Sequence, residues 1–268
     1  APMSAPPSAQ ALESAAEAFY GREQLPYTRT EYELWATNRP TEVYGPGATW
    51  QRHPDRTEYG TNDSIGDRAV RILLAEGGRL IAAGMYRPGT LRRRVDTDAD
   101  GTSVTVFTDR LGRRICERRK AADGAQVTET RFVYDIRGDL RYVVSPEGFA
   151  LIEADASGSG DERTAAGQVP GDAATLYSDR YDYDIWHRVV SRTPAGCEAV
   201  EYVYDRLGRV VMWRDGALRS AGRWHVTKYD DSMRRVVEGS APCRQTREAL
   251  QSLYGDSLFV EHFVADYN

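Results

Sequence analysis

Five aspartates recur along the middle of the chain, each followed three residues later by glycine or a substitute for it and, in most copies, by arginine at the next position. Repeated carboxylates suggest general acid–base chemistry, which uses paired acidic side chains. An aspartate before x-x-Gly also accepts backbone hydrogen bonds and begins a type I turn, which a glycine closes in the left-handed conformation. That fixed position favours turn chemistry over catalysis. The repeated motif comprises Asp109, Gly112, Arg113, Tyr134, Asp135, Gly138, Tyr183, Asp184, Arg188, Tyr204, Asp205, Gly208, Arg209, Tyr229, Asp230 and Arg234.

Other reactive side chains lack a recognisable arrangement. The four histidines have no metal-ligand spacing such as His-Glu-x-x-His, and the three cysteines contain no Cys-x-x-Cys pair. No Gly-x-Ser-x-Gly nucleophile motif is present. We therefore predict a non-enzymatic chain with no catalytic, metal or cofactor-binding residues, in which the histidines are structural and the cysteines are buried free thiols. These residues are His53, His187, His225, His262, Cys116, Cys197 and Cys243.

Each motif copy has the pattern of a β-hairpin. Tyr202 and Tyr204 share one face of an incoming strand, because side chains alternate along a strand. Asp205 and Gly208 form the turn, and the strand returns from Arg209. In two copies His187 and Met233 stand where glycine is expected, so each takes a positive φ or the turn is of another type. A single hairpin is marginally stable, whereas consecutive hairpins share one sheet.

The copies recur at intervals of roughly 20 to 50 residues, which is typical of repeat architectures. We divide the chain into a linker at 1–18, an N-terminal β region at 19–103, a hairpin-repeat region at 104–245, and a helix followed by a truncated strand at 246–268. The Ala- and Glu-rich stretch within the linker could form a short helix. A Gly-, Ser- and Ala-rich loop is expected at 153–175, and the predicted helix runs from Thr246 to Tyr254.

Composition limits the class of protein. The 268 residues are 41% hydrophobic and 28% charged, with a net charge of -5, which indicates a globular chain without a strongly basic nucleic-acid surface. No apolar run is long enough for a transmembrane helix, and no signal peptide is visible. The chain begins Ala1-Pro2-Met3, so we expect a piece of a longer protein.

These strings resemble the YD-repeat, or RHS, family of bacterial proteins, whose loose repeat is Tyr-x-Tyr-Asp-x-x-Gly-Arg followed by Leu or Val. The strings Phe132-Val-Tyr-Asp-Ile-Arg-Gly-Asp-Leu and Tyr202-Val-Tyr-Asp-Arg-Leu-Gly-Arg-Val match it closely. Glu42-Val-Tyr-Gly-Pro-Gly-Ala-Thr-Trp50 and Glu58-Tyr-Gly-Thr-Asn62 are similar to the region that precedes the repeats in the Bacteroidetes branch. The resemblance covers roughly residues 27–255.

The resemblance implies an all-β fold of antiparallel hairpins in a curved, spiralling sheet. The residue pattern predicts a short C-terminal helix in addition. It implies a secreted or cell-surface location and a shell that encloses or displays a C-terminal effector, as in polymorphic toxins. The expected partners are the remaining repeats and the effector of the parent chain. Two alternatives stay open: a carbohydrate- or cell-surface-binding module that uses exposed tryptophans such as Trp186 or Trp213, and a hydrolase with a polar cleft.

Overall fold

The computed structural model describes residues 8–20, 25, 27–124, 126–158 and 167–256. The chain divides into two compact units. The first contains Ala1–Val70 and Tyr86–Glu129, and the second contains Arg71–Met85 and Thr130–Asn268. Antiparallel sheet dominates both units, and a short helix lies near the C-terminus, as the all-β prediction requires.

The first unit holds six antiparallel strands, which lie side by side in sequence order, with β4 (Arg71–Glu76) and β5 (Arg79–Met85) inserted in the chain between β3 and β6. Val95 and Phe107 are buried on this sheet and alternate with more exposed residues, whereas Cys116 lies between Ile115 and Glu117, which are also buried. Two 3-10 helices, η1 (Trp50–Arg52) and η2 (Gly66–Arg68), lie in its loops. The strands are β1 (Arg29–Tyr32), β2 (Pro40–Tyr44), β3 (Asp55–Thr61), β6 (Arg92–Thr97), β7 (Ser103–Thr108) and β8 (Arg114–Lys120).

Part of the expected linker is helical. Helix α1 (Ala9–Tyr20) is rich in alanine and glutamate, which have high helix propensity. Every side chain of α1 whose burial is described is exposed. The short helix expected within this stretch is therefore confirmed.

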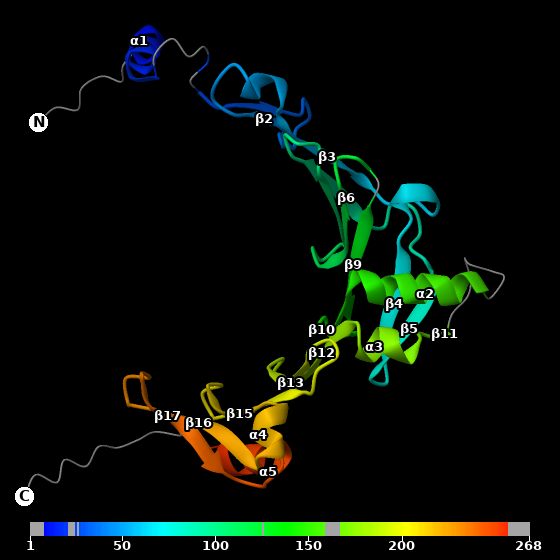
Figure 1. Ribbon diagram of the computed structural model, residues 1–268, viewed down its shortest axis with the longest axis vertical. Coiled ribbons are helices and arrows are strands. Elements are labelled where there is room, and N and C mark those ends of the chain that lie inside the picture. The colour runs from blue at the N-terminus through cyan, green and yellow to red at the C-terminus, as the bar shows by residue number, and fades with distance from the viewer. Residues whose placement is uncertain (1–7, 21–24, 26, 125, 159–166, 257–268) are drawn as a thin grey trace, which may run out of the picture. The chain divides into compact units, whose positions relative to one another are not determined.

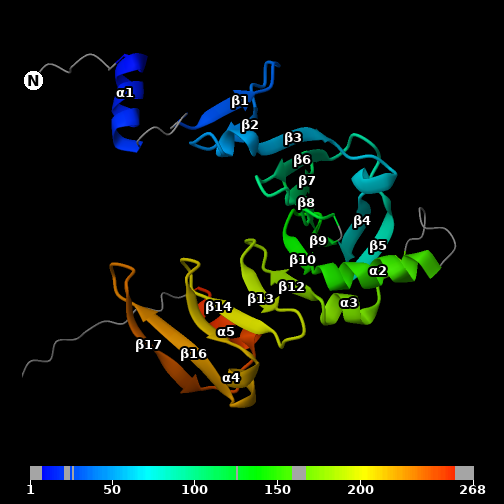
Figure 2. The same ribbon diagram turned by 45° about the horizontal axis from the view of Figure 1, so that its top comes forward.

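The hairpins of the second unit follow one another side by side (Figure 2). Each successive strand pairs antiparallel with the one before it, and most hairpins have a register shift next to the turn, the mark of a β-bulge. The strands are β9 (Val127–Tyr134), which begins in the first unit, β10 (Leu140–Val144), β12 (Ser178–Tyr183), β13 (Val189–Thr193), β14 (Val200–Tyr204), β15 (Val210–Arg214), β16 (Arg223–Tyr229) and β17 (Arg235–Pro242).

A second layer packs on the first strands of this unit (Figure 1). It consists of a small sheet, β4 (Arg71–Glu76), β5 (Arg79–Met85) and β11 (Gly167–Gln168), with helices α2 (Pro146–Gly158) and α3 (Gly171–Thr175). Leu80, Val144, Phe149 and Ile152 belong to its buried core. The hydroxyl of Tyr142 donates to the Gly78 carbonyl at 2.8 Å, which links the two sheets.

The prediction of a loop at 153–175 is wrong at both described ends of that range, because α2 continues to Gly158 and α3 begins at Gly171. The sequence contains a helix start signal at Ser145-Pro146, although the residues that follow are rich in loop-forming types. Ser145 accepts a hydrogen bond from the Gly148 amide at 3.3 Å, and Pro146 follows it at the first helical position. Packing of one face of α2 then outweighs the weak helix propensity of its later residues.

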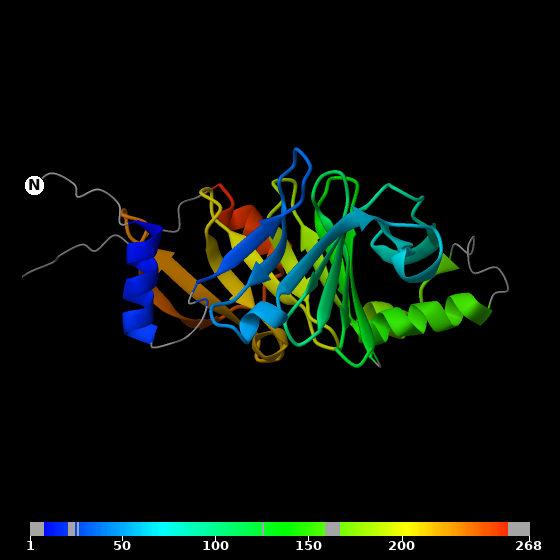
Figure 3. The ribbon, with the colours of Figure 1, turned by 90° about the horizontal axis from the view of Figure 1, so that it is seen from above.

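Helix α5 (Arg247–Tyr254) matches the predicted C-terminal helix and begins at Thr246, whose hydroxyl accepts from the Ala249 amide. The helix lies beside β14 (Figure 3). Leu250 enters a core with Val203 and Trp224, while the short α4 (Gly216–Ser220) packs on β15 and β16. The strand expected at 259–268 lies outside the described residues.

Candidate functional site

The five motif turns share one geometry. In the hairpin of Asp205, the Gly208 amide donates to the Asp205 carbonyl at 3.0 Å. The Asp205 carboxylate accepts from the Leu207 amide at 3.0 Å and from the Arg209 amide at 2.9 Å. Corresponding contacts occur at Asp109, Asp135, Asp184 and Asp230. Each carboxylate is therefore occupied in organising its own turn.

The arginine after the turn binds the aspartate of the same hairpin. Its Nε lies 2.7 Å from the second carboxylate oxygen in each of four hairpins. We call this aspartate and arginine, four residues apart, a turn clamp. In these four hairpins the arginine pairs with the aspartate of its own turn, since the bulge brings the arginine back over that turn. The turn clamps are Asp109–Arg113, Asp184–Arg188, Asp205–Arg209 and Asp230–Arg234.

Three of these carboxylates have a lowered pKa. For Asp109 and Asp184, burial acts to raise the pKa, but hydrogen bonds and the charge of the following arginine outweigh it. For Asp230, the hydrogen bond from the Arg234 amide is the main cause of the lowered pKa. A carboxylate held ionised in this way suits a structural anion better than a general acid.

Tyrosines connect one hairpin of the second unit to the next. Tyr183, Tyr204 and Tyr229 each end the incoming strand of a hairpin. Each hydroxyl donates to the first carbonyl of the preceding hairpin's return strand. The distances are 2.9 Å to Leu140, 2.6 Å to Val189 and 2.9 Å to Val210. We call each such connection a hairpin junction.

At two junctions the turn-clamp arginine lies on the tyrosine ring of the next hairpin. The guanidinium of Arg188 is 4.6 Å from the centroid of the Tyr204 ring, and that of Arg209 is 4.4 Å from the Tyr229 ring. These distances are within the range of cation–π contacts. One arginine thus serves both its own turn and the adjoining hairpin.

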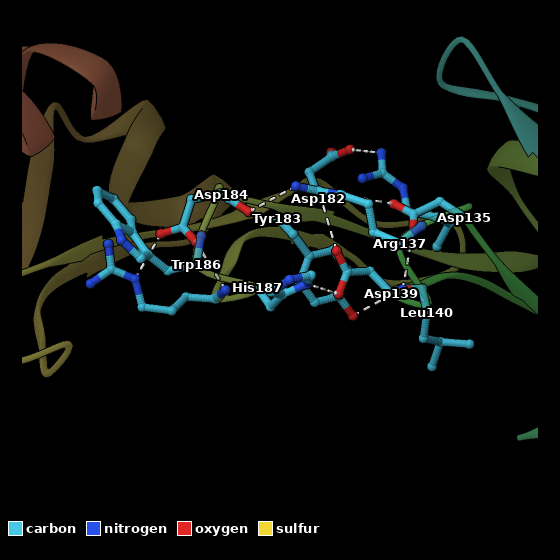
Figure 4. A network of polar contacts seen from close by, with 11 residues as sticks. Asp135, Arg137, Asp139, Leu140, Asp182, Tyr183, Asp184, Trp186 and His187 are labelled. Atoms are coloured by element: carbon cyan, nitrogen blue, oxygen red, sulfur yellow. Dashed lines mark hydrogen bonds and ion pairs between the residues drawn. The ribbon is translucent and has the colours of Figure 1, made fainter. Parts of the chain in front are cut away.

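The remaining junction has a different ionic contact (Figure 4). Asp139 stands where arginine is expected and lies 2.7 Å from Nδ1 of His187, which stands where the next hairpin has its glycine. Arg137 approaches the other Asp139 oxygen at 3.1 Å. The histidine contact was not predicted. The sequence does contain a signal for it. Two successive hairpins depart from the motif, one with the acidic Asp139 and the next with His187, which can donate a hydrogen bond.

Helix α5 closes the exposed side of one motif tyrosine. The Gln251 side chain accepts from the Tyr204 amide at 2.9 Å and donates to the Tyr204 carbonyl at 2.8 Å. Both backbone groups, which lack a strand partner on that side, are thereby satisfied. Sequence reasoning missed Gln251, because a lone glutamine in a helix gives no sign of its partner.

His187 and Met233 have φ of 63° and 65°, so both substitutes for glycine keep the left-handed turn conformation. His225 stacks on Trp213, with ring centroids 4.9 Å apart. Cys116 is buried and Cys243 partly buried, but Cys197 is exposed, so its expected burial is wrong. His262 lies outside the described residues.

Within the described residues, no group of three or more histidine, cysteine, aspartate or glutamate side chains is placed to hold a metal ion. None of the described helices combines the length and the apolar character required to cross a membrane.

Comparison with protein-family models gives no match, and comparison with curated proteins gives none either. Among solved structures, the chain is similar to one from the Photorhabdus luminescens Tc holotoxin pore, with a TM-score of 0.42 and 14% identity over 86% of this chain. It is also similar to a chain of the TcdB2-TccC3 crystal structure, with a TM-score of 0.39 and 13% identity over 87% of this chain. This chain spans 12% of the length of each of those chains.

Proposed function

We propose that the chain is a non-catalytic scaffold segment of an RHS-type, YD-repeat protein. The hairpin junctions are the observation that supports this function. Each junction uses the last residue of one strand and the first carbonyl of the preceding return strand, so the same contact can be repeated along a sheet. The motif aspartates organise their own turns and three motif tyrosines form the junctions, which supports a structural role for these residues.

A second part of the proposal concerns the longer protein to which this segment would belong. We propose that it is secreted or presented at a cell surface, and that its further repeats complete a shell around a C-terminal effector. The motif positions support this idea, because the repeat recurs in five copies, two of which match the family's pattern closely. The proposed division into an N-terminal β region at 19–103 and a repeat region at 104–245 belongs to the same interpretation.

Protease protection in the full-length parent tests the proposal. The segment that follows the repeats is expected to resist protease in the intact parent and to be digested quickly when expressed alone. Arg188→Met combined with Tyr204→Leu breaks one junction and should increase its digestion, whereas Arg206→Gln, at an exposed turn position, should not. Equal digestion of the segment in the parent and in isolation would contradict enclosure.

Carbohydrate binding is a weaker candidate, supported by the 65% exposure of Trp186. The guanidinium of Arg188 lies 4.8 Å from the centre of that ring, and Trp213 is stacked on His225, so each indole has a neighbour on one face. A glycan array compares the wild type with Trp186→Ala. Binding that disappears in the variant would favour the module, and the absence of any binding would remove it.

A further inference from the structure

A cavity of about 520 Å³ opens on the sheet of the first unit, over β3, β6, β7 and β8. Half of its lining residues are arginines, and Asp96 is the single acidic residue among them. We call it the arginine cavity. Its lining consists of Arg39, Tyr59, Gly60, Arg92, Arg93, Arg94, Asp96, Val106, Thr108 and Arg114.

Strand register places three of these arginines on one face. Arg92 pairs across the sheet with Thr108, which in turn pairs with Arg114. Arg94 is two residues from Arg92, so the two side chains point to the same face about 7 Å apart along the strand. Tyr59 pairs with Arg94 and therefore shares this face.

The neighbouring acids do not neutralise the three arginines evenly. Arg94 contacts Asp96 at 2.8 Å, and Arg114 contacts Glu117 at 2.6 Å. Both side chains remain more than half exposed, so their guanidinium groups are accessible to a ligand. In the described part of the chain Arg92 forms no ion pair, although it lies between the other two in the register.

The wall of the cavity is held in place by ionic contacts. Arg39 lies 4.0 Å from the centre of the Tyr59 ring, and its guanidinium binds both carboxylate oxygens of Glu33 at 2.7 and 2.9 Å. These contacts lower the pKa of Glu33 to about 2, through the Arg39 hydrogen bond first and the Thr37 hydrogen bond second. Arg93 approaches Glu58 at 3.9 Å. Glu33 and Glu58, which do not line the cavity, thus pair with Arg39 and Arg93. Arg92 is left as the lining arginine without an acidic partner among the described residues.

We propose that the arginine cavity binds a small ligand that carries two or more phosphate or sulfate groups. Guanidinium forks recognise such oxyanions through paired hydrogen bonds, and a cavity of this volume accommodates a small molecule. Arg92 supplies an unpaired fork, while Arg94 and Arg114 can each exchange a carboxylate for a ligand oxyanion. A single monovalent anion would satisfy only one of the three positions. This inference is independent of the scaffold role of the second unit.

Calorimetric titration of the full chain tests the site with tripolyphosphate and with a disulfated disaccharide, which separate the phosphate and sulfate sources. Arg92→Gln should weaken binding of the preferred ligand roughly tenfold, because it removes one charge-assisted contact. Arg52→Gln is the matched control, since Arg52 is exposed in the same unit and does not line the cavity. Arg92→Lys keeps the charge but not the fork, and should recover part of the affinity.

Hexaglutamate is the third ligand to be titrated. Binding of tripolyphosphate or the disaccharide that falls in Arg92→Gln and persists in Arg52→Gln would support the site. Absence of binding by both at millimolar concentration would overturn it, as would equal losses in the two glutamine variants. Tighter binding of hexaglutamate than of either small ligand would also overturn it, in favour of an acidic polypeptide partner. Circular dichroism of Arg92→Gln verifies that a loss of binding does not reflect unfolding.

Discussion

The junctions of the second unit differ in one component and agree in another. The tyrosine hydroxyl reaches the same carbonyl position whether the preceding hairpin carries Asp139, Arg188 or Arg209. The ionic contact differs, because two junctions place an arginine on the tyrosine ring and the third places His187 against Asp139. The hydrogen bond from the tyrosine hydroxyl to the backbone carbonyl is therefore the constant part of the junction. The side-chain pair beside it varies: arginine on tyrosine at two junctions, and aspartate with histidine at the third.

A second difference lies between clamps of the same type. The Asp205 side chain is fully buried and that of Arg209 is 13% exposed, whereas Arg234, in the last hairpin among the described residues, is 78% exposed. The Asp205–Arg209 pair lies beneath the next hairpin, whose Tyr229 ring covers the guanidinium. The energetic weight of a turn clamp should thus depend on how far a neighbouring hairpin shields it from water.

Asp205→Ala should cause the largest loss of stability. It removes several hydrogen bonds and leaves the Arg209 charge in a nearly buried position, at a cost of about 3–5 kcal/mol. Urea unfolding followed by tryptophan fluorescence measures the free energy of unfolding. Asp230→Ala is the matched control and should lose distinctly less, since Arg234 is in water. Equal losses would show that the covering hairpin does not matter.

Tyr204→Phe should lower the free energy of unfolding by about 1–2 kcal/mol, because the Val189 carbonyl loses its donor while the ring stays in place. Tyr183→Phe and Tyr229→Phe remove the same bond at the other two junctions. Similar losses in all three variants, in the same urea experiment, would establish the tyrosine hydroxyl as the common contact. A loss confined to the junctions with arginine would refute it.

Acid should weaken the turn clamps in a defined pH range. A carboxyl whose pKa is lower in the folded state stabilises the fold above its unfolded pKa, about 4, and this stabilisation is lost as the pH falls through the lowered folded pKa. The Asp184 pKa is lowered in this way. The free energy of unfolding should therefore fall below about pH 4, and Asp184→Asn should make that pH dependence shallower. An unchanged slope in the variant would contradict the assignment.

Met233→Gly should have the smallest effect and the opposite sign. Met233 has φ of 65° and an exposed side chain, so glycine relieves strain at little cost in contacts and should add about 0.5–1 kcal/mol of stability. His187→Gly relieves a similar φ but removes the contact with Asp139, so its gain should be smaller or absent. An equal gain in both variants, by urea unfolding, would mean that the histidine contact adds nothing.

The sequence predicted the turns well because their chemistry is local. Asp205 and Gly208 lie in one short string, and their roles follow from the conformations that each residue type permits. The partners across the sheet were not predictable in the same way. The contact of Arg209 with Tyr229 and that of Asp139 with His187 depend on strand order and register, which the repeat alone does not specify.

The second layer shows the same limit. The later residues of helix α2 have a loop-like composition, whereas its start signal at Ser145-Pro146 and its buried face with Phe149 and Ile152 favour a helix. The arginine cavity needed the pairing of Arg92, Thr108 and Arg114 across three strands. A one-residue change of register would have sent these side chains to the opposite face.

A double-mutant cycle at Arg209 and Tyr229 tests most directly the claim that the side chains of one hairpin hold the next. Urea unfolding is measured for the wild type, Arg209→Met, Tyr229→Leu and the double variant. The guanidinium lies over the ring and is largely shielded from water, so we predict a coupling free energy of about 0.5–2 kcal/mol. Additive effects of the two substitutions, with no coupling, would contradict the claim.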